Sequence, residues 1–140
     1  MKTKEEIVNN WLPRYTGKAL NTFGKYFLLT NYNYYVNLFA KWHNVEIEGK
    51  ENNMPSATAE GITIINFGMG SPNAATIMDL LSAVDPNAVL FLGKCGGLKK
   101  KNTLGDLILP IAAIRSDGTS NEERIGATDP ICPEFRGVRI

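Results

Sequence analysis

Two glycine-rich turns carry the residues best suited to binding an anion. Gly68, Met69 and Gly70 come directly before a predicted helix, where small residues let backbone N–H groups approach a phosphate or ribose oxygen. Lys94 lies in the second turn, Gly93–Gly97, and its ammonium is suited to a phosphate oxygen. Neither turn completes the dinucleotide fingerprint or the phosphate loop, so tight turns without a ligand are the alternative interpretation.

Arg115 is a third candidate, because it ends an apolar run and could hold an anionic substrate through two hydrogen bonds. A surface ion pair is the alternative for this arginine.

His43, the only histidine, is predicted to cap the end of a helix, and Asp106 to stabilise a turn. The two cysteines, Cys95 and Cys132, lack the spacing of a zinc site or a disulfide framework, so we expect Cys95 to be a reduced thiol packed in its turn.

The two turns are positioned by a predicted strand–helix–strand unit. The apolar runs Ile62–Phe67 and Ala88–Leu92 predict strands buried on both faces of a parallel sheet. Between them Ser71 is the predicted helix N-cap, with Pro72 at the first helical position. The helix has a core-facing stripe at helical spacing, formed by Ile77, Leu80, Leu81 and Val84. Both turns then lie at the carboxyl ends of parallel strands, where open α/β sheets bind ligands.

The preceding residues predict two further helices. In the first, Lys4–Leu12, the side chains of Ile7, Val8 and Trp11 share one face, and Pro13 is expected to end the helix. The second follows a strand over Lys25–Thr30, and its predicted core-facing stripe consists of Tyr35, Leu38, Phe39 and Trp42. The segment 30–33 between this strand and helix is therefore a third turn at the predicted ligand-binding edge.

Two more strands are expected. Ser56–Glu60 is predicted to form an edge hairpin leading into Ile62, and Gly105–Ile114 to form an apolar strand interrupted at Pro110. The 140 residues, 44% of them hydrophobic, suffice for one domain with its own core. A net charge of +1 favours neither a nucleic-acid nor a membrane-surface partner, and no run is long enough to span a membrane. We therefore expect a soluble, cytoplasmic protein.

Three stretches carry a resemblance to a known family: LPRYTG at 12–17, ITIINFGMGSPNAATIMDLL at 62–81, and VLFLGKCGGLKKKNTLGDLILPIAAIRSDGTS at 89–120. The chain resembles the nucleoside phosphorylase superfamily, and within it the AMP nucleosidase branch. The resemblance implies a three-layer α/β fold with a mainly parallel central sheet, incomplete at the C-terminus. Residues 1–121 are expected to form the N-terminal half of such a domain, followed by an irregular tail, 122–140, unlike the family.

The resemblance also implies an activity: hydrolysis of the N-glycosidic bond of AMP to adenine and ribose 5-phosphate, with water in place of the inorganic phosphate used by phosphorylases. No cofactor or metal is expected, and family members are homo-oligomers, commonly hexamers. The predicted substrate-binding residues are Thr30, Asn31, Gly68, Met69, Gly70, Lys94, Cys95, Gly96, Gly97 and Arg115.

The sequence departs from the family pattern at several positions. Phe91 stands where phosphorylases carry a phosphate-binding arginine, and Lys94 takes a serine or threonine position. The family's ribose-binding Met-Glu pair and its general-acid aspartate have no counterpart here, so no catalytic residue is predicted, and we expect an incomplete site. Loss of general-acid help typically costs about 10²–10⁴ in rate. Two alternatives stay open: a phosphorylase or other purine nucleosidase, and a non-catalytic piece that binds nucleotide or forms oligomers.

Overall fold

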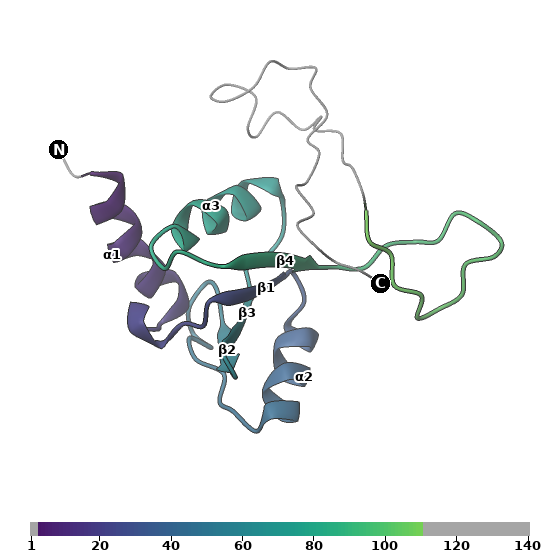
Figure 1. Cartoon of the computed structure of the whole chain (residues 1–140), viewed down its shortest axis with the longest axis horizontal. Coiled ribbons are helices and arrows are strands. Elements are labelled where there is room, and N and C mark those ends of the chain that lie inside the picture. The colour runs from purple at the N-terminus through teal and green to yellow at the C-terminus, as the bar shows by residue number, and fades with distance from the viewer. Residues whose placement is uncertain (1–2, 111–140) are drawn as a thin grey trace, which may run out of the picture. The chain divides into compact units, whose positions relative to one another are not determined.

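A four-stranded, mostly parallel sheet organises the chain in the computed structural model, which describes residues 3–110. Its strands lie in the order β2-β3-β1-β4 (Figure 1). The bounds are β1 Tyr26–Thr30, β2 Ser56–Ala59, β3 Ile62–Asn66 and β4 Ala88–Leu92. Strand β1 pairs in parallel with both β3 and β4, whereas β2 pairs antiparallel with β3. The predicted edge hairpin is therefore confirmed as β2 and β3.

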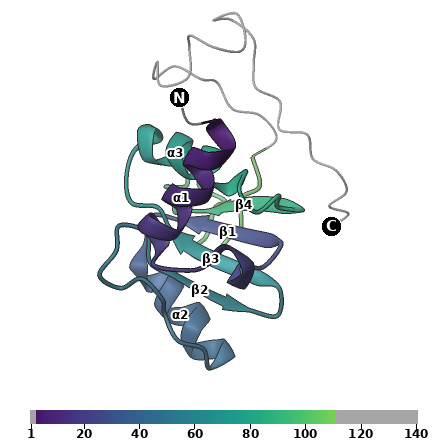
Figure 2. The same ribbon diagram turned by 90° about the vertical axis from the view of Figure 1, so that its left-hand side faces the viewer.

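Helices cover both faces of this sheet. Helices α1 (Lys4–Thr16) and α3 (Ser71–Leu81) pack on one face and α2 (Asn33–His43) on the other, and a short 3₁₀ helix, η1, spans Leu20–Thr22 (Figures 1 and 2). Alternate strand residues point to opposite faces, as in any strand. Phe27 and Ile65 thus join the core beneath α1 and α3, while Ile64 packs under α2. The three-layer α/β architecture is confirmed.

Helix α1 continues past Pro13, contrary to the sequence prediction. Proline lacks the N–H that would bond one turn back and its ring crowds that carbonyl, but its fixed φ is helical, and the helix proceeds to Gly17, whose positive φ of 67° ends it. The hydroxyl of Thr16 donates to the Leu12 carbonyl at 2.7 Å within this added turn. The buried face consists of Val8, Leu12 and Thr16. Because the face is rotated relative to the prediction, Ile7 and Trp11 are exposed.

The other two helices follow their predicted patterns more closely. In α3 the stripe is confirmed for Ile77, Leu80 and Leu81, which are buried, whereas Val84 is buried just beyond the helix, which ends at Leu81. Its N-cap is Gly70 rather than Ser71, because the chain enters the helix with a φ of 93° that favours glycine. In α2 Phe39 is buried, but Trp42 is 73% exposed, and Val36 and Ala40 complete the core face instead.

Strand β4 differs most from expectation. It pairs with β1, which separates it from β3, and it lies at the edge of the described sheet. An edge strand lacks a neighbour on one side, and Leu90 and Phe91 are accordingly more than half exposed rather than buried. The described part of the predicted strand 105–114, residues 105–110, has no strand structure, and residues 111–114 lie outside the described part.

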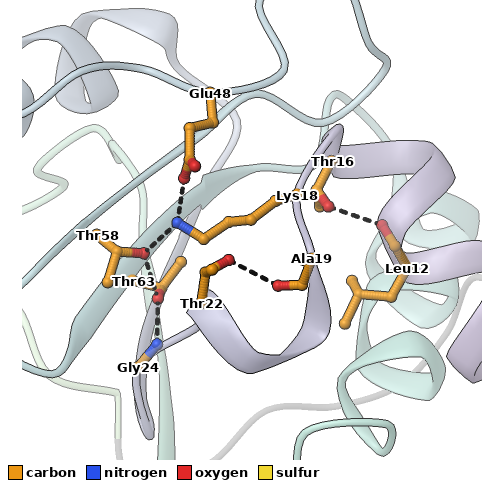
Figure 3. Close-up of polar contacts among 9 residues, drawn as sticks. All are labelled: Leu12, Thr16, Lys18, Ala19, Thr22, Gly24, Glu48, Thr58 and Thr63. Atoms are coloured by element: carbon orange, nitrogen blue, oxygen red, sulfur yellow. Dashed lines mark hydrogen bonds and ion pairs between the residues drawn. The ribbon is translucent and has the colours of Figure 1, made fainter.

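A buried lysine links α1 to the sheet at the amino ends of β1 and β3 (Figure 3). The Lys18 ammonium bonds to the Glu48 carboxylate and donates to the Thr58 hydroxyl at 2.9 Å. The chain of bonds continues through Thr63, whose hydroxyl lies 2.8 Å from that of Thr58 and accepts from the Gly24 N–H at 2.8 Å. These bonds satisfy polar groups that the fold removes from water.

The chain divides into two compact units between Lys94 and Cys95. In the second unit Asp106 accepts hydrogen bonds from the backbone N–H and the hydroxyl of Thr103, at 2.9 and 2.7 Å. Asp106 is thus a turn residue, as predicted. The segments 1–121 and 122–140 stay a prediction. No helix within residues 3–110 is long and apolar enough to cross a membrane.

Candidate functional site

Two turns of the first unit and the lysine that follows β4 lie at one edge of the sheet. In the parallel register Thr30 of β1 is the partner of Asn66 in β3 and of Leu92 in β4. Because all three strands end at this register position, the residues that follow them lie at the same edge. These residues include Asn31, the glycine turn 68–70, and Lys94.

Asn31 joins the turn 30–33 to the glycine turn 68–70. Its amide nitrogen donates to the sulfur of Met69 at 3.4 Å. Its side-chain oxygen is buried and has no hydrogen-bond partner within residues 3–110. A buried acceptor left in this way costs about 1–3 kcal/mol, which a ligand hydroxyl could recover. Neighbouring Thr30 is fully buried, and its hydroxyl accepts the backbone N–H of Tyr32 at 3.2 Å.

The glycine turn is shaped by its own backbone and by asparagine side chains. Gly68 and Gly70 have φ values of 82° and 93°, which disfavour any residue with a side chain. The Gly68 N–H donates to the Asn66 side chain at 2.9 Å, so this amide is already bonded within the protein. Within the described chain no acceptor is bonded to the amides of Met69 and Gly70. These two amides remain available for an anion at the start of α3.

Lys94 lies against aromatic rings. Its Nζ is 4.8 Å from the centre of the Tyr32 ring, 5.7 Å from that of Tyr35 and 5.9 Å from that of Tyr34. None of the ion pairs among residues 3–110 involves this lysine. Its positive charge is therefore attracted by ring faces but not neutralised by a carboxylate.

The remaining predicted residues fall outside this edge. Cys95, Gly96 and Gly97 begin the second unit, and all three are exposed. The Cys95 thiol is free, as expected, but it is exposed rather than packed in its turn. Arg115 lies outside the described residues. His43 is the last residue of α2, but the residue that caps this helix is Asn44 and not His43 as predicted; the Nδ1 of His43 is 3.5 Å from the Glu60 carboxylate.

Sequence reasoning missed Asn33 and the three tyrosines at the turn 30–33 and the start of α2. Tyr35 was assigned only to the core stripe of its helix, and Tyr32 and Tyr34 had no assigned role. The available signal was the clustering of three tyrosines between Asn31 and Val36, at a turn between strand and helix. Asn33 was likewise missed, and its side-chain oxygen accepts from Asn66 at 2.5 Å.

Comparison with known proteins identifies the family of this chain. The model of the Phosphorylase superfamily matches residues 31–138, which is more than half of the chain. The chain belongs to the phosphorylase superfamily. The family match begins at Asn31, within the first turn of the candidate site, and includes the other two turns.

The chain matches only part of the length of individual superfamily members. It superposes on the crystal structure of AMP nucleosidase from Bacteroides thetaiotaomicron with a TM-score of 0.87 and 58% identity, covering 96% of this chain and 56% of that one. The AMP nucleosidase of Escherichia coli strain K12 is 31% identical over 143 residues, covering 76% of this chain and 30% of its own length. The chain thus spans about half or less of these relatives.

Phosphorylases of this superfamily are also similar. The guanosine phosphorylase of Halorubrum lacusprofundi is 32% identical over 75 residues, which cover 52% of this chain and 31% of the relative. The crystal structure of uridine phosphorylase from Vibrio fischeri superposes with a TM-score of 0.69 at 24% identity, covering 83% of this chain and 49% of the other. At this identity the superposition establishes a shared fold only.

Proposed function

We propose that the carboxyl edge of β1, β3 and β4 binds AMP, as part of a site that hydrolyses its N-glycosidic bond to adenine and ribose 5-phosphate. The observation that carries the proposal is the Lys94 ammonium. It lies at this edge, and no carboxylate within residues 3–110 pairs with it. A dianionic phosphate monoester is the natural partner of such a charge. The resemblance to AMP nucleosidases supports the same substrate.

The other residues of the edge suit a sugar phosphate. The amides of Met69 and Gly70, at the start of α3, can donate to phosphate oxygens, where the helix dipole also favours negative charge. The buried oxygen of Asn31 needs a donor, which a phosphate dianion lacks and a ribose hydroxyl has. We therefore assign Lys94 and the glycine turn to the phosphate, and Asn31 to the sugar.

The position of Phe91 favours a nucleosidase over a phosphorylase. By resemblance, phosphorylases carry an arginine here for free phosphate, whereas the Phe91 ring packs against Phe67 with ring centres 5.8 Å apart. An aromatic side chain cannot replace a guanidinium as a ligand of inorganic phosphate. The three turns contain no aspartate, glutamate or histidine, so we assign them substrate binding and not proton donation to the purine.

Calorimetric titration of the full chain with AMP and with adenosine tests the proposal. We expect AMP to bind more tightly than adenosine, and the Lys94→Met variant to lose that preference. Equal affinity of the unaltered chain for AMP and adenosine would refute the assignment of a phosphate to this edge. Adenine release is followed in parallel by chromatography, with and without inorganic phosphate. Release from adenosine that requires phosphate would instead identify a phosphorylase, and AMP binding without adenine release a nucleotide-binding piece.

A further inference from the structure

We infer that Tyr32 is a positioning residue for Lys94: its ring holds the lysine ammonium at the binding edge without consuming the positive charge that a phosphate needs. The inference rests on the proposed function in one respect, namely that the 5′-phosphate of AMP is the anion. The contact between the ring and the ammonium does not depend on that assignment and can be measured without any ligand.

Tyr32 is held in place through its backbone and through its ring. Tyr32 is the N-cap residue of α2. Its backbone N–H donates to the buried Thr30 hydroxyl at 3.2 Å, and its backbone carbonyl accepts the Tyr35 N–H at 3.2 Å. The Tyr35 ring meets the Tyr32 ring edge-on, at 5.9 Å between centres and 90° between planes, which is a favourable arrangement of aromatic rings. The ring nearest the ammonium is therefore fixed before any ligand binds.

An aromatic ring holds an ammonium in a different way than a carboxylate does. A carboxylate would pair with Lys94 and compete directly with an incoming phosphate. A ring face attracts the cation through its quadrupole and leaves the net charge unchanged. An ammonium also has three N–H donors, and those that do not face the ring can bond to phosphate oxygens. The ring thus restricts a long, flexible side chain to one region, which lowers the entropy lost when phosphate binds.

The tyrosines explain why an exposed lysine is useful here. Lys94 follows edge strand β4, and it makes no hydrogen bond or ion pair within residues 3–110. Without the rings its four-carbon stem would sample many rotamers in solvent. Tyr32, at 4.8 Å, is the nearest ring, and the rings of Tyr34 and Tyr35 are about 1 Å farther away. Replacement of Tyr32 is therefore the most direct perturbation.

The first measurement tests the contact alone. In the full chain labelled with ¹³C-lysine, the ε-CH₂ signal of Lys94, assigned by its loss in Lys94→Met, is expected upfield of the other lysines because of the ring currents. The upfield shift should be retained in Tyr32→Phe, which keeps the ring, and reduced in Tyr32→Leu. Tyr26→Leu is the matched control, since Tyr26 is 51% exposed at the first residue of β1, the opposite end of the strand. A Lys94 signal that is the same in Tyr32→Leu as in the unaltered chain would overturn the inference.

The second measurement tests the consequence for ligand binding. Tyr32→Leu is expected to weaken AMP binding about two- to five-fold, the equivalent of the roughly 0.5–1 kcal/mol of an exposed cation–π contact, and to leave adenosine binding unchanged. Tyr32→Phe and Tyr26→Leu should bind AMP as the unaltered chain does. AMP affinity unchanged in Tyr32→Leu, or affinities for AMP and adenosine reduced equally, would overturn the inference while the proposed function stands. No AMP binding by the unaltered chain would overturn the proposed function, and with it the role of Tyr32 toward phosphate, even if the upfield shift is present.

Discussion

Replacement of Glu48 by leucine is expected to destabilise the protein more than replacement of Lys18 by methionine, although each removes the same ion pair. The two side chains differ in burial: that of Lys18 is 3% exposed and that of Glu48 43%. Glu48→Leu leaves an ammonium buried with one remaining hydrogen-bond partner, the Thr58 hydroxyl (Figure 3), and with the Phe23 ring centre 5.5 Å from its Nζ. Lys18→Met leaves a carboxylate that water can reach, and methionine fills the space of the lysine stem.

The magnitudes follow from this difference. Loss of one partner of a fully buried pair costs about 3–5 kcal/mol, and the partial exposure of Glu48 reduces the expected cost of Glu48→Leu to about 2–3 kcal/mol. Lys18→Met loses two hydrogen bonds but also removes a buried charge, so its expected cost is about 0–1.5 kcal/mol. In the double variant no charge is left buried, and we expect a cost close to that of Lys18→Met alone.

Urea unfolding of the full chain at pH 7, followed by far-ultraviolet circular dichroism, measures these free energies. Lys41→Met is the matched control, because Lys41 is exposed on α2 and its loss should change stability by less than about 0.5 kcal/mol. AMP binding should be unchanged in all variants, because the network lies at the amino ends of β1 and β3. A Lys18→Met variant as unstable as Glu48→Leu, or a double variant with the sum of both costs, would refute the reasoning.

Two further predictions concern turns. Gly49→Ala is expected to cost at least about 2 kcal/mol, because Gly49 has a φ of 67° and an added Cβ would lie 1.9 Å from the Thr16 carbonyl oxygen. Gly61→Ala, at a φ of 78° with open space around the Cβ, should cost only about 1 kcal/mol in the same urea assay, and equal costs would contradict the steric argument. The pKa of Asp106 should lie below its usual 3.8, because Thr103 donates two hydrogen bonds to the carboxylate. The bond from the backbone N–H has the larger effect and the bond from the hydroxyl the smaller one. The stabilisation of this turn is thus present above pH 3.8 and is lost as the pH falls through the lowered pKa. Thr103→Val, which keeps only the backbone bond, should raise the pKa toward 3.8 in a carboxyl NMR titration, and an unchanged midpoint would argue against the hydroxyl bond.

Local patterns in the sequence predicted the elements that local physics decides. The spacing of Ile77, Leu80 and Leu81 correctly predicted the core face of α3, because helical spacing alone brings these residues together. Pro13 misled the prediction of α1, since its ring is compatible with a helix that ends only one turn later at Gly17. The helix end is set by the left-handed glycine and not by the proline.

Long-range pairing was not readable from the sequence. The apolar run 88–92 predicted a buried strand, but its exposure depends on which strands flank it, and β4 contacts only β1 in the described sheet. The same limit applies to the candidate site. The strand ends correctly predicted that Asn31, the glycine turn 68–70 and Lys94 share an edge. The contact of Lys94 with Tyr32, by contrast, joins residues far apart in the chain, and no spacing rule predicts it.

The central place of β1 has a consequence for synthesis on the ribosome. Its partners β3 and β4 are both made later, and β4 begins at Ala88, well after β1 ends at Thr30. At about 5–20 residues per second, translation of the intervening residues takes roughly 3–12 s. Until β4 is made, the side of β1 that pairs with β4 has no strand partner, while the β2–β3 hairpin, which precedes β4 in the chain, can already form.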